Sequence, residues 1–104
     1  MAKKEKVEMF EALHPDPTKQ GTRVTKEYYD VYKEALLKII PTKDESEEGI
    51  EFVALSKDVV AHLPEGITDK TSVGWWTTVL KLDLEARGVI ERLPTKGRQR
   101  VRKT

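Results

Sequence analysis

The chain has 104 residues, of which 38% are hydrophobic and 36% are charged, and its formal net charge is +1. This length is typical of a single domain with one hydrophobic core. The chain contains no cysteine, which excludes disulfide bonds, iron–sulfur clusters and thiolate zinc sites.

The charge is distributed unevenly along the chain. Residues 1–86 contain 12 Lys or Arg and 17 Asp or Glu, whereas residues 87–104 contain seven Lys or Arg and only Glu91 as an acid. Such asymmetry favours an anionic partner at the basic end. The alternative interpretation is a solvated basic tail that maintains solubility.

The first residues, Met-Ala-Lys-Lys-Glu-Lys, are charged and lead into no apolar run. We therefore expect neither a signal peptide nor a membrane span, and we expect a cytoplasmic protein. Over residues 3–13 the apolar residues Val7, Phe10 and Leu13 have spacings compatible with a helix, and a strand or irregular structure also remains open. Two prolines, Pro15 and Pro17, end this segment. We expect residues 1–24 to form an N-terminal extension and residues 25–104 to form the main domain.

A long helix is expected over residues 26–40, with Thr25 as its N-cap and Pro41 as its end. Apolar residues recur at i, i+4, i+7, i+8 and i+11, which is typical of a helix with one buried face. The residues of that face are Tyr28, Tyr32, Ala35, Leu36 and Ile39.

Residues 42–48 contain no apolar side chain and predict an acidic loop. The next residues are rich in β-branched and aromatic types, which predicts a strand over residues 50–55. Ser56 is placed to cap a short helix over residues 57–63. Its inward-facing residues would be Val59, Val60 and Leu63.

A second long helix is expected over residues 71–87, where Thr71 or Ser72 would cap its start and Gly88 would end it. Its apolar residues cover an arc of about 200°, so only a narrow face is open to solvent. The residues of that open face are Gly74, Thr77, Thr78, Lys81 and Glu85.

We predict the positions of four further side chains of this helix. Asp83 and Arg87 interrupt the apolar arc at i and i+4, and we expect them to pair at the edge of the core, because an unpaired buried carboxylate is costly. Trp76 lies on the apolar arc and is expected in the core. Trp75 lies nearer its margin, where partial exposure would suit a dimer or partner contact.

The C-terminal end predicts a β-hairpin over residues 89–103. Its first strand would span residues 89–93, its turn residues 94–97 and its second strand residues 98–103. The resulting order is helix, strand, helix, helix, strand and strand. This order predicts an α+β fold with the winged helix-turn-helix layout.

The run Leu82-Asp-Leu-Glu-Ala-Arg-Gly-Val-Ile-Glu-Arg resembles the junction between recognition helix and wing in winged-helix transcription regulators, including the multidrug-resistance regulator family. The positions that match the regulators' pattern are Leu84, Glu85, Arg87, Gly88, Ile90 and Arg92. Lys96-Gly97-Arg98 stands where the wing tip would be. Together with Gly74-Trp75-Trp76, the same run also resembles a family of short uncharacterised bacterial proteins. The resemblance to the regulators implies a winged helix and DNA binding.

The expected recognition helix is less basic than that of the regulators, because its open face offers only Lys81 as a cation. Base-specific readout needs side chains such as Arg, Lys, Asn or Gln, so we expect phosphate contact more than sequence recognition. Alternate residues of the hairpin strand would place several cations on one face, which suits a phosphate backbone. The candidate nucleic-acid-binding residues are Thr71, Ser72, Thr77, Thr78, Lys81, Lys96, Arg98, Arg100 and Arg102.

Two hypotheses about function follow. The first is a small winged-helix protein that binds DNA weakly through its basic wing. The second is a protein-docking module, favoured by the partly exposed Trp75 and by the acidic segment, residues 44–51, whose charge opposes that of the wing and could drive head-to-tail self-association. A positive face shared by the second long helix and the hairpin would favour DNA, whereas acidic residues that interrupt this face would favour docking.

Catalysis is not expected. His14 and His62 are the only histidines, and neither has a second His or Cys at metal-ligand spacing. The chain contains no glycine-rich phosphate loop and no nucleophile motif. We therefore expect no enzyme activity, no cofactor, no metal and no small-molecule substrate.

Overall fold

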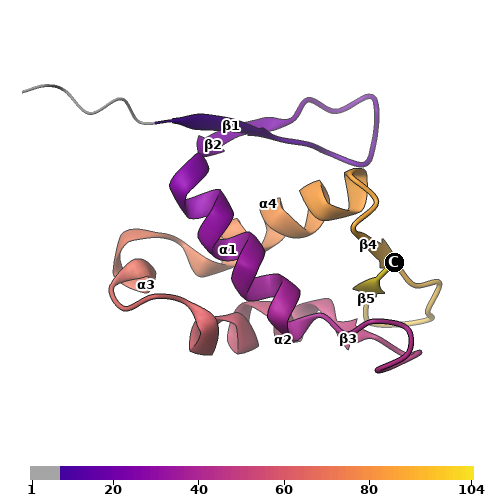
Figure 1. Cartoon of the computed structure of the whole chain (residues 1–104). Coiled ribbons are helices and arrows are strands. Elements are labelled where there is room, and N and C mark those ends of the chain that lie inside the picture. Colours follow the sequence, from indigo (N-terminus) through magenta and orange to yellow (C-terminus); the bar gives the residue numbers. More distant parts are fainter. Residues whose placement is uncertain (1–7) are drawn as a thin grey trace, which may run out of the picture.

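The computed structural model describes residues 8–104 and has a mixed α+β architecture. Figure 1 shows a β-hairpin along the top, the helices in the middle and a small sheet at the lower right. The elements are β1 (Met9–Ala12), β2 (Thr22–Thr25), α1 (Lys26–Ile39), β3 (Ile50–Glu51), α2 (Phe52–Asp58), the 3₁₀ helix η1 (Val59–His62), α3 (Ile67–Lys70), α4 (Val73–Ala86), β4 (Ile90–Arg92) and β5 (Arg100–Lys103). In the part of the chain that is described, no helix is long and apolar enough to cross a membrane.

Of the alternatives left open for residues 3–13, the structure has a strand, β1; residues 3–7 lie outside the described residues. β1 pairs antiparallel with β2, and Phe10 lies opposite Val24. Ala12 and Val24 are buried, because this hairpin packs against α1 and α4. The spacing of the apolar residues suited a helix, but pairing with β2 determines the backbone.

Helix α1 confirms the expected helix over residues 26–40. Its buried face contains Tyr32, Ala35 and Leu36 as expected, but Tyr29 is buried where Tyr28 was expected. Tyr28 is only half-buried and contacts the edge of Trp76, with 5.9 Å between ring centroids. The buried stripe is therefore rotated slightly from the expected one.

The strand expected over residues 50–55 is much shorter, because β3 contains only two residues and α2 begins at Phe52. The amide of Phe52 donates to the carbonyl of Gln99 at 2.7 Å. Leu55 and Val59 are fully buried, and their i, i+4 spacing is that of one helix face. Ser56 therefore lies inside α2 and does not cap a helix over residues 57–63.

The residues expected to face inward from that short helix behave differently from one another. Val59 is buried and Leu63 is half-buried, but Val60 is 44% exposed. At Val59 the chain changes from the α-helix α2 to the 3₁₀ helix η1, which ends before Pro64. A 3₁₀ helix has fewer residues per turn than an α-helix, so its residues face other directions than those expected, and Val60 faces solvent.

Helix α4 begins two residues later and ends one residue earlier than the expected helix over residues 71–87, and it lies between the predicted cap Ser72 and the predicted stop Gly88. The hydroxyl of Ser72 accepts a hydrogen bond from the amide of Trp75 at 3.4 Å and so caps the first turn. Gly88 ends the helix with φ +75°, in the left-handed region that favours glycine. The amide of Val89 donates to Leu84 O and that of Gly88 to Glu85 O, which satisfies the last carbonyls in a Schellman motif.

The three-stranded sheet has the antiparallel order β3-β5-β4. Ile50 lies opposite Val101, and Glu51 lies opposite Arg100. Val101 and Ile90 are buried and extend the core that α1, α2 and α4 form. The opposite face of the sheet therefore presents its charged residues to solvent.

Candidate nucleic-acid interface

The C-terminal hairpin carries most of the sequence-predicted cations. Its turn includes Gly97, with φ +98°, and the neighbouring Lys96 is exposed. Arg98 lies just before β5, and 73% of its side chain is exposed. Arg100 and Arg102 lie on the sheet face opposite Val101, and both are only partly exposed. The hairpin therefore has an open tip and a more covered base.

Three arginines of the hairpin, Arg98, Arg100 and Arg102, pair with acids of the same chain. Glu51 on β3 lies 3.4 Å from Arg98 and 3.2 Å from Arg100. Glu91 on β4 lies 3.5 Å from Arg102. The register of the sheet explains these pairs, because Glu51 lies opposite Arg100 and Glu91 opposite Arg102.

The backbone of the acidic segment also contacts these arginines. A guanidinium nitrogen of Arg102 donates to Glu47 O at 2.8 Å. One nitrogen of Arg100 lies within 3.5 Å of Glu48 O and 3.4 Å of Gly49 O. The acidic segment therefore contacts the hairpin of its own chain. The sequence-based hypothesis was that these opposite charges attract each other between two copies of the chain.

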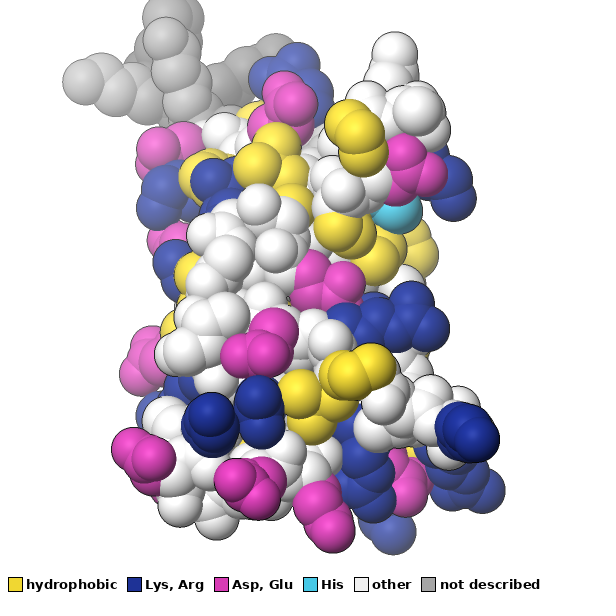
Figure 2. Space-filling model, turned by 90° about the vertical axis from the view of Figure 1, so that its right-hand side faces the viewer, with side chains coloured by type: hydrophobic (Ala, Val, Ile, Leu, Met, Phe, Trp, Pro, Cys, Tyr) yellow, Lys and Arg dark blue, Asp and Glu magenta, His cyan; other side chains and the backbone are white. Residues whose placement is uncertain are grey.

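The acidic segment and the hairpin enclose a cleft of about 710 Å³ between them. Its lining includes four basic and two acidic residues: Lys43, Lys96, Arg100, Arg102, Glu47 and Glu48. Figure 2 views this end of the molecule and shows dark-blue Lys and Arg side chains at the lower right and magenta Asp and Glu side chains along the bottom edge. Acidic residues thus interrupt the positive surface at the base of the hairpin, which by the criterion given above favours docking, whereas Lys96 and Arg98 at the tip are exposed.

The face of α4 that was expected to be open is partly buried, so this expectation is wrong for two of its residues. Thr77 is 1% and Lys81 is 4% exposed. The ammonium group of Lys81 lies 2.6 Å from a carboxylate oxygen of Glu85 and 5.0 Å from the ring centre of Phe52. The cause is α2, which packs against this side of α4. Neither Thr77 nor Lys81 has the exposure that contact with nucleic acid requires.

The remaining candidates lie on α4 or just before it, and their hydroxyl groups differ in how accessible they are to a ligand. The Thr71 hydroxyl lies 2.7 Å from Ile67 O and 2.7 Å from the Tyr32 hydroxyl. Ser72 and Thr78 are exposed, although Ser72 caps the helix and Thr78 donates to Gly74 O at 2.9 Å. Hydroxyl groups with such local bonds retain lone pairs but supply no positive charge.

The outer surface of α4 adjoins α2 along a shallow groove of about 280 Å³. The groove is lined by Phe52, Val53, Ser56, Gly74, Thr77 and Thr78. Val53 is 59% exposed. Trp75, which follows Gly74 on α4, is 48% exposed, and this partial exposure was expected from the sequence. Trp76 is buried, as expected, and stacks on Tyr32 with an interplanar angle of 8°.

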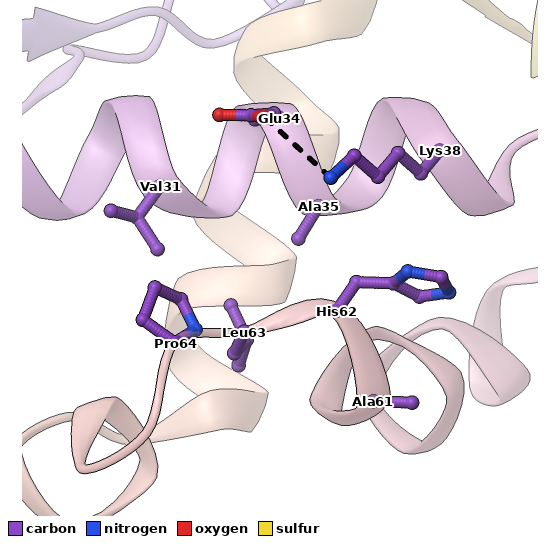
Figure 3. Close-up of a pocket in the computed structure, with 8 residues that line it drawn as sticks. All are labelled: Val31, Glu34, Ala35, Lys38, Ala61, His62, Leu63 and Pro64. Carbon is purple, nitrogen blue, oxygen red and sulfur yellow. Dashed lines mark ion pairs between the residues drawn. The ribbon is translucent and has the colours of Figure 1, made fainter.

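A second groove, of about 410 Å³, lies between α1 and η1 (Figure 3). Leu63 and Pro64 lie on one side of the groove and face Val31 and Ala35 of α1 on the other side. The Glu34–Lys38 ion pair lies along α1. His62 lies at one end of this groove, whereas His14 lies in the loop after β1, where its Nδ1 accepts from the Asp16 amide at 3.0 Å. Within residues 8–104 no three His, Asp or Glu side chains gather as metal ligands would.

Sequence reasoning missed the role of Glu51. It placed this residue in a strand and in the acidic segment, but not in contact with Arg98 and Arg100. The signal that could have found it is the cross-strand register, which needs the pairing of residues about 50 positions apart.

Residues 9–101 match a protein family described as a family of unknown function (DUF6958). This match covers most of the chain, so the chain belongs to that family. No curated protein and no solved structure matches the chain.

Proposed function

We propose that this member of a family of unknown function is a winged-helix protein that binds duplex DNA weakly, mainly through phosphate contacts from the tip of its C-terminal hairpin. The topology supports the fold: α1, β3, α2, α4, β4 and β5 occur in this order, with η1 and α3 between α2 and α4, and β5 lies between β3 and β4. In a winged helix, α4 would be the recognition helix and the hairpin the wing.

One observation carries the proposal. Gln99, which follows the hairpin tip, is hydrogen-bonded to the start of α2, and the start of α2 lies beside the outer surface of α4. The Phe52 amide binds Gln99 O at 2.7 Å, and Phe52 lines the same groove as Gly74 and Thr78. The exposed cations of the tip are therefore connected, through the start of α2, to the surface of α4 that carries the Thr78 hydroxyl. This arrangement suits a duplex that contacts both.

The proposed contacts are fewer than the sequence suggested. Lys96 and Arg98 would bind phosphates, and Ser72 and Thr78 would add hydroxyl contacts. The exposed part of α4 has no Arg, Lys, Asn or Gln, so little direct readout of bases is expected. We propose no enzyme activity and no cofactor.

Fluorescence anisotropy with a labelled duplex tests the proposal across a range of salt concentrations. Each phosphate contact contributes about −0.9 to the slope of log K against log salt. The double variant Lys96→Glu/Arg98→Glu should bind at least about tenfold more weakly at low salt and flatten that slope by about 2. The matched control, Lys19→Glu/Arg23→Glu, has the same change of charge at exposed sites around the β1–β2 turn. Absence of binding at low salt, or equal binding by the two double variants, would contradict the proposal.

A second candidate function is docking, and here the occupant we propose is a second copy of the chain. The observation that favours it is the exposure of Trp75 and Val53 beside a groove with no charged lining residue. A two-fold dimer brings the same patch of two copies together, so an uncharged patch avoids self-repulsion. Gly74 leaves open space at this surface, where an added Cβ would meet no atom within 4 Å.

Sedimentation velocity at several concentrations tests self-association. The wild type should shift from monomer to dimer as concentration rises, and Trp75→Ala should remain monomeric. The control Val60→Ala removes a similarly exposed apolar side chain from η1 and should dimerise like the wild type. A wild type that stays monomeric throughout would rule out this candidate.

A further inference from the structure

We propose that the acidic segment is an autoinhibitory contact, which occupies the arginines at the base of the hairpin and must open before they can bind DNA phosphates. This inference rests on the proposed DNA binding and adds to it a means of regulation. The arginines concerned are Arg100 and Arg102.

The first support is that both arginines are already occupied. Arg100 contacts the Glu51 carboxylate at 3.2 Å and two carbonyl groups of the acidic segment. Arg102 contacts the Glu91 carboxylate at 3.5 Å and Glu47 O at 2.8 Å. Carboxylates and carbonyls present the oxygen acceptors that a phosphate would present. While these contacts hold, the most accessible cations of the hairpin are those of its tip, Lys96 and Arg98.

The second support is the position of the acidic side chains. Glu47 and Glu48 are exposed and line the cleft that also contains Lys43 and Lys96. A phosphate in this cleft would approach two carboxylates at close range, and like charges repel strongly at such distances. The acidic segment therefore both occupies the arginines and repels their prospective ligand.

The third support is that the segment is attached at its ends and held in the middle by these contacts. At one end, Thr42 bridges Lys103, and the Lys103 amide donates to Pro41 O at 2.8 Å. At the other end, Ile50 pairs with Val101. Between these anchors, the carbonyls of Glu47 and Glu48 meet the hairpin through arginine side chains. These contacts are partly exposed hydrogen bonds between side chain and backbone, and the ion pairs beside them are screened by salt, so we expect a polyanion to displace them without unfolding the domain.

The test removes the acidic charges and keeps the side-chain shapes. In anisotropy measurements with a duplex, Glu47→Gln/Glu48→Gln/Glu51→Gln should bind at least about tenfold more tightly than wild type. The log–log salt slope should steepen by about 1, because Arg100 loses its carboxylate partner and gains a phosphate contact, whereas Arg102 keeps its contact with Glu91. The matched control, Glu27→Gln/Glu34→Gln/Glu65→Gln, has the same change in net charge at exposed positions away from the cleft. It should change affinity far less and leave the slope near that of wild type.

A second readout follows the movement itself. The chain has no cysteine, so Asp44→Cys and Thr95→Cys provide a unique pair of spin-label sites on the acidic segment and the hairpin turn. Saturating duplex should lengthen the distance between the labels. If wild type binds duplex while the glutamine variant equals its control, or while the label distance stays constant, the autoinhibitory contact is overturned and DNA binding stands. If neither protein binds duplex, the proposed function fails and this inference fails with it.

Discussion

Asp83 is fully buried on α4 and forms an ion pair of 2.8 Å with Arg87, one turn later on the same helix. The carboxylate also accepts hydrogen bonds from the Leu13 amide, at 2.8 Å, and from the Tyr29 hydroxyl. Arg87 in turn donates to Glu11 O at 3.0 Å. The pair that sequence spacing predicted within one helix therefore also attaches the β1–β2 hairpin to the domain.

Replacement of Asp83 by Ala should destabilise the protein strongly. The change removes three hydrogen-bond acceptor contacts, and we expect a loss of about 3 kcal/mol in the free energy of unfolding. Urea denaturation followed by circular dichroism measures it. The control Asp30→Ala breaks an exposed i, i+4 pair with Lys26 and should cost about 0.5 kcal/mol or less. Equal costs for the two variants would show that Asp83 has no special role.

Tyr29 should make stability depend on pH in the alkaline range. Burial, followed by the hydrogen bond to Asp83, raises the pKa of its hydroxyl above the ordinary 10.0. The folded state therefore retains the proton more tightly than the unfolded state, and this contribution is complete below pH 10. It declines as the pH rises above 10 toward the folded-state pKa. Stability curves from pH 9 to 11.5 should fall less steeply for Tyr29→Phe than for wild type, and parallel curves would contradict this account.

The elements with strong local signals were predictable from the sequence. Ser72 and Gly88 mark the ends of α4 through a cap and a left-handed residue, both of which depend on neighbouring backbone alone. Pro41 likewise marks the end of α1, although the hydroxyl of Thr25, the expected N-cap, makes no capping hydrogen bond. By contrast, α2 depends on Gln99, which receives the Phe52 amide from 47 positions away. Strand propensity alone could not reveal that contact.

The candidate interface was predictable in its charges but not in its pairing. The alternation of arginines along β5 is visible in the sequence, whereas the contacts of Glu51 with Arg98 and Arg100 depend on the register of β3 against β5. The burial of Lys81 likewise depends on the packing of α2, since Phe52 lies under its ammonium group. Long-range packing thus decides which cations are free.

Gly49 should tolerate no side chain at the junction between the acidic segment and β3. Its φ is +67°, and an added Cβ would lie 2.3 Å from Val101 O, a backbone atom that cannot move aside. We expect Gly49→Ala to lower the free energy of unfolding by about 2 to 3 kcal/mol. Gly97→Ala is the control, because its φ is +98° but an added Cβ there meets no atom within 4 Å. It should cost only about 1 kcal/mol, and similar losses in urea denaturation would contradict the role of the close contact.

The two adjacent tryptophans should differ sharply in their contributions to stability. Trp76 is 7% exposed, stacks on Tyr32 with ring centroids 5.5 Å apart, and makes a T-shaped contact with Tyr28. Trp76→Ala should therefore cost about 3 to 5 kcal/mol, which for a domain of this size lowers Tm by at least about 12 °C. Trp75 is 48% exposed, and Trp75→Ala should cost about 1 kcal/mol or less, because a side chain that keeps half its surface in water gains less from folding. Differential scanning calorimetry at one low protein concentration measures both, with Val60→Ala as a control for loss of an exposed apolar side chain. A large loss for Trp75→Ala under these conditions would mean that Trp75 supports the monomer's core, and would remove the basis for a docking surface at α4.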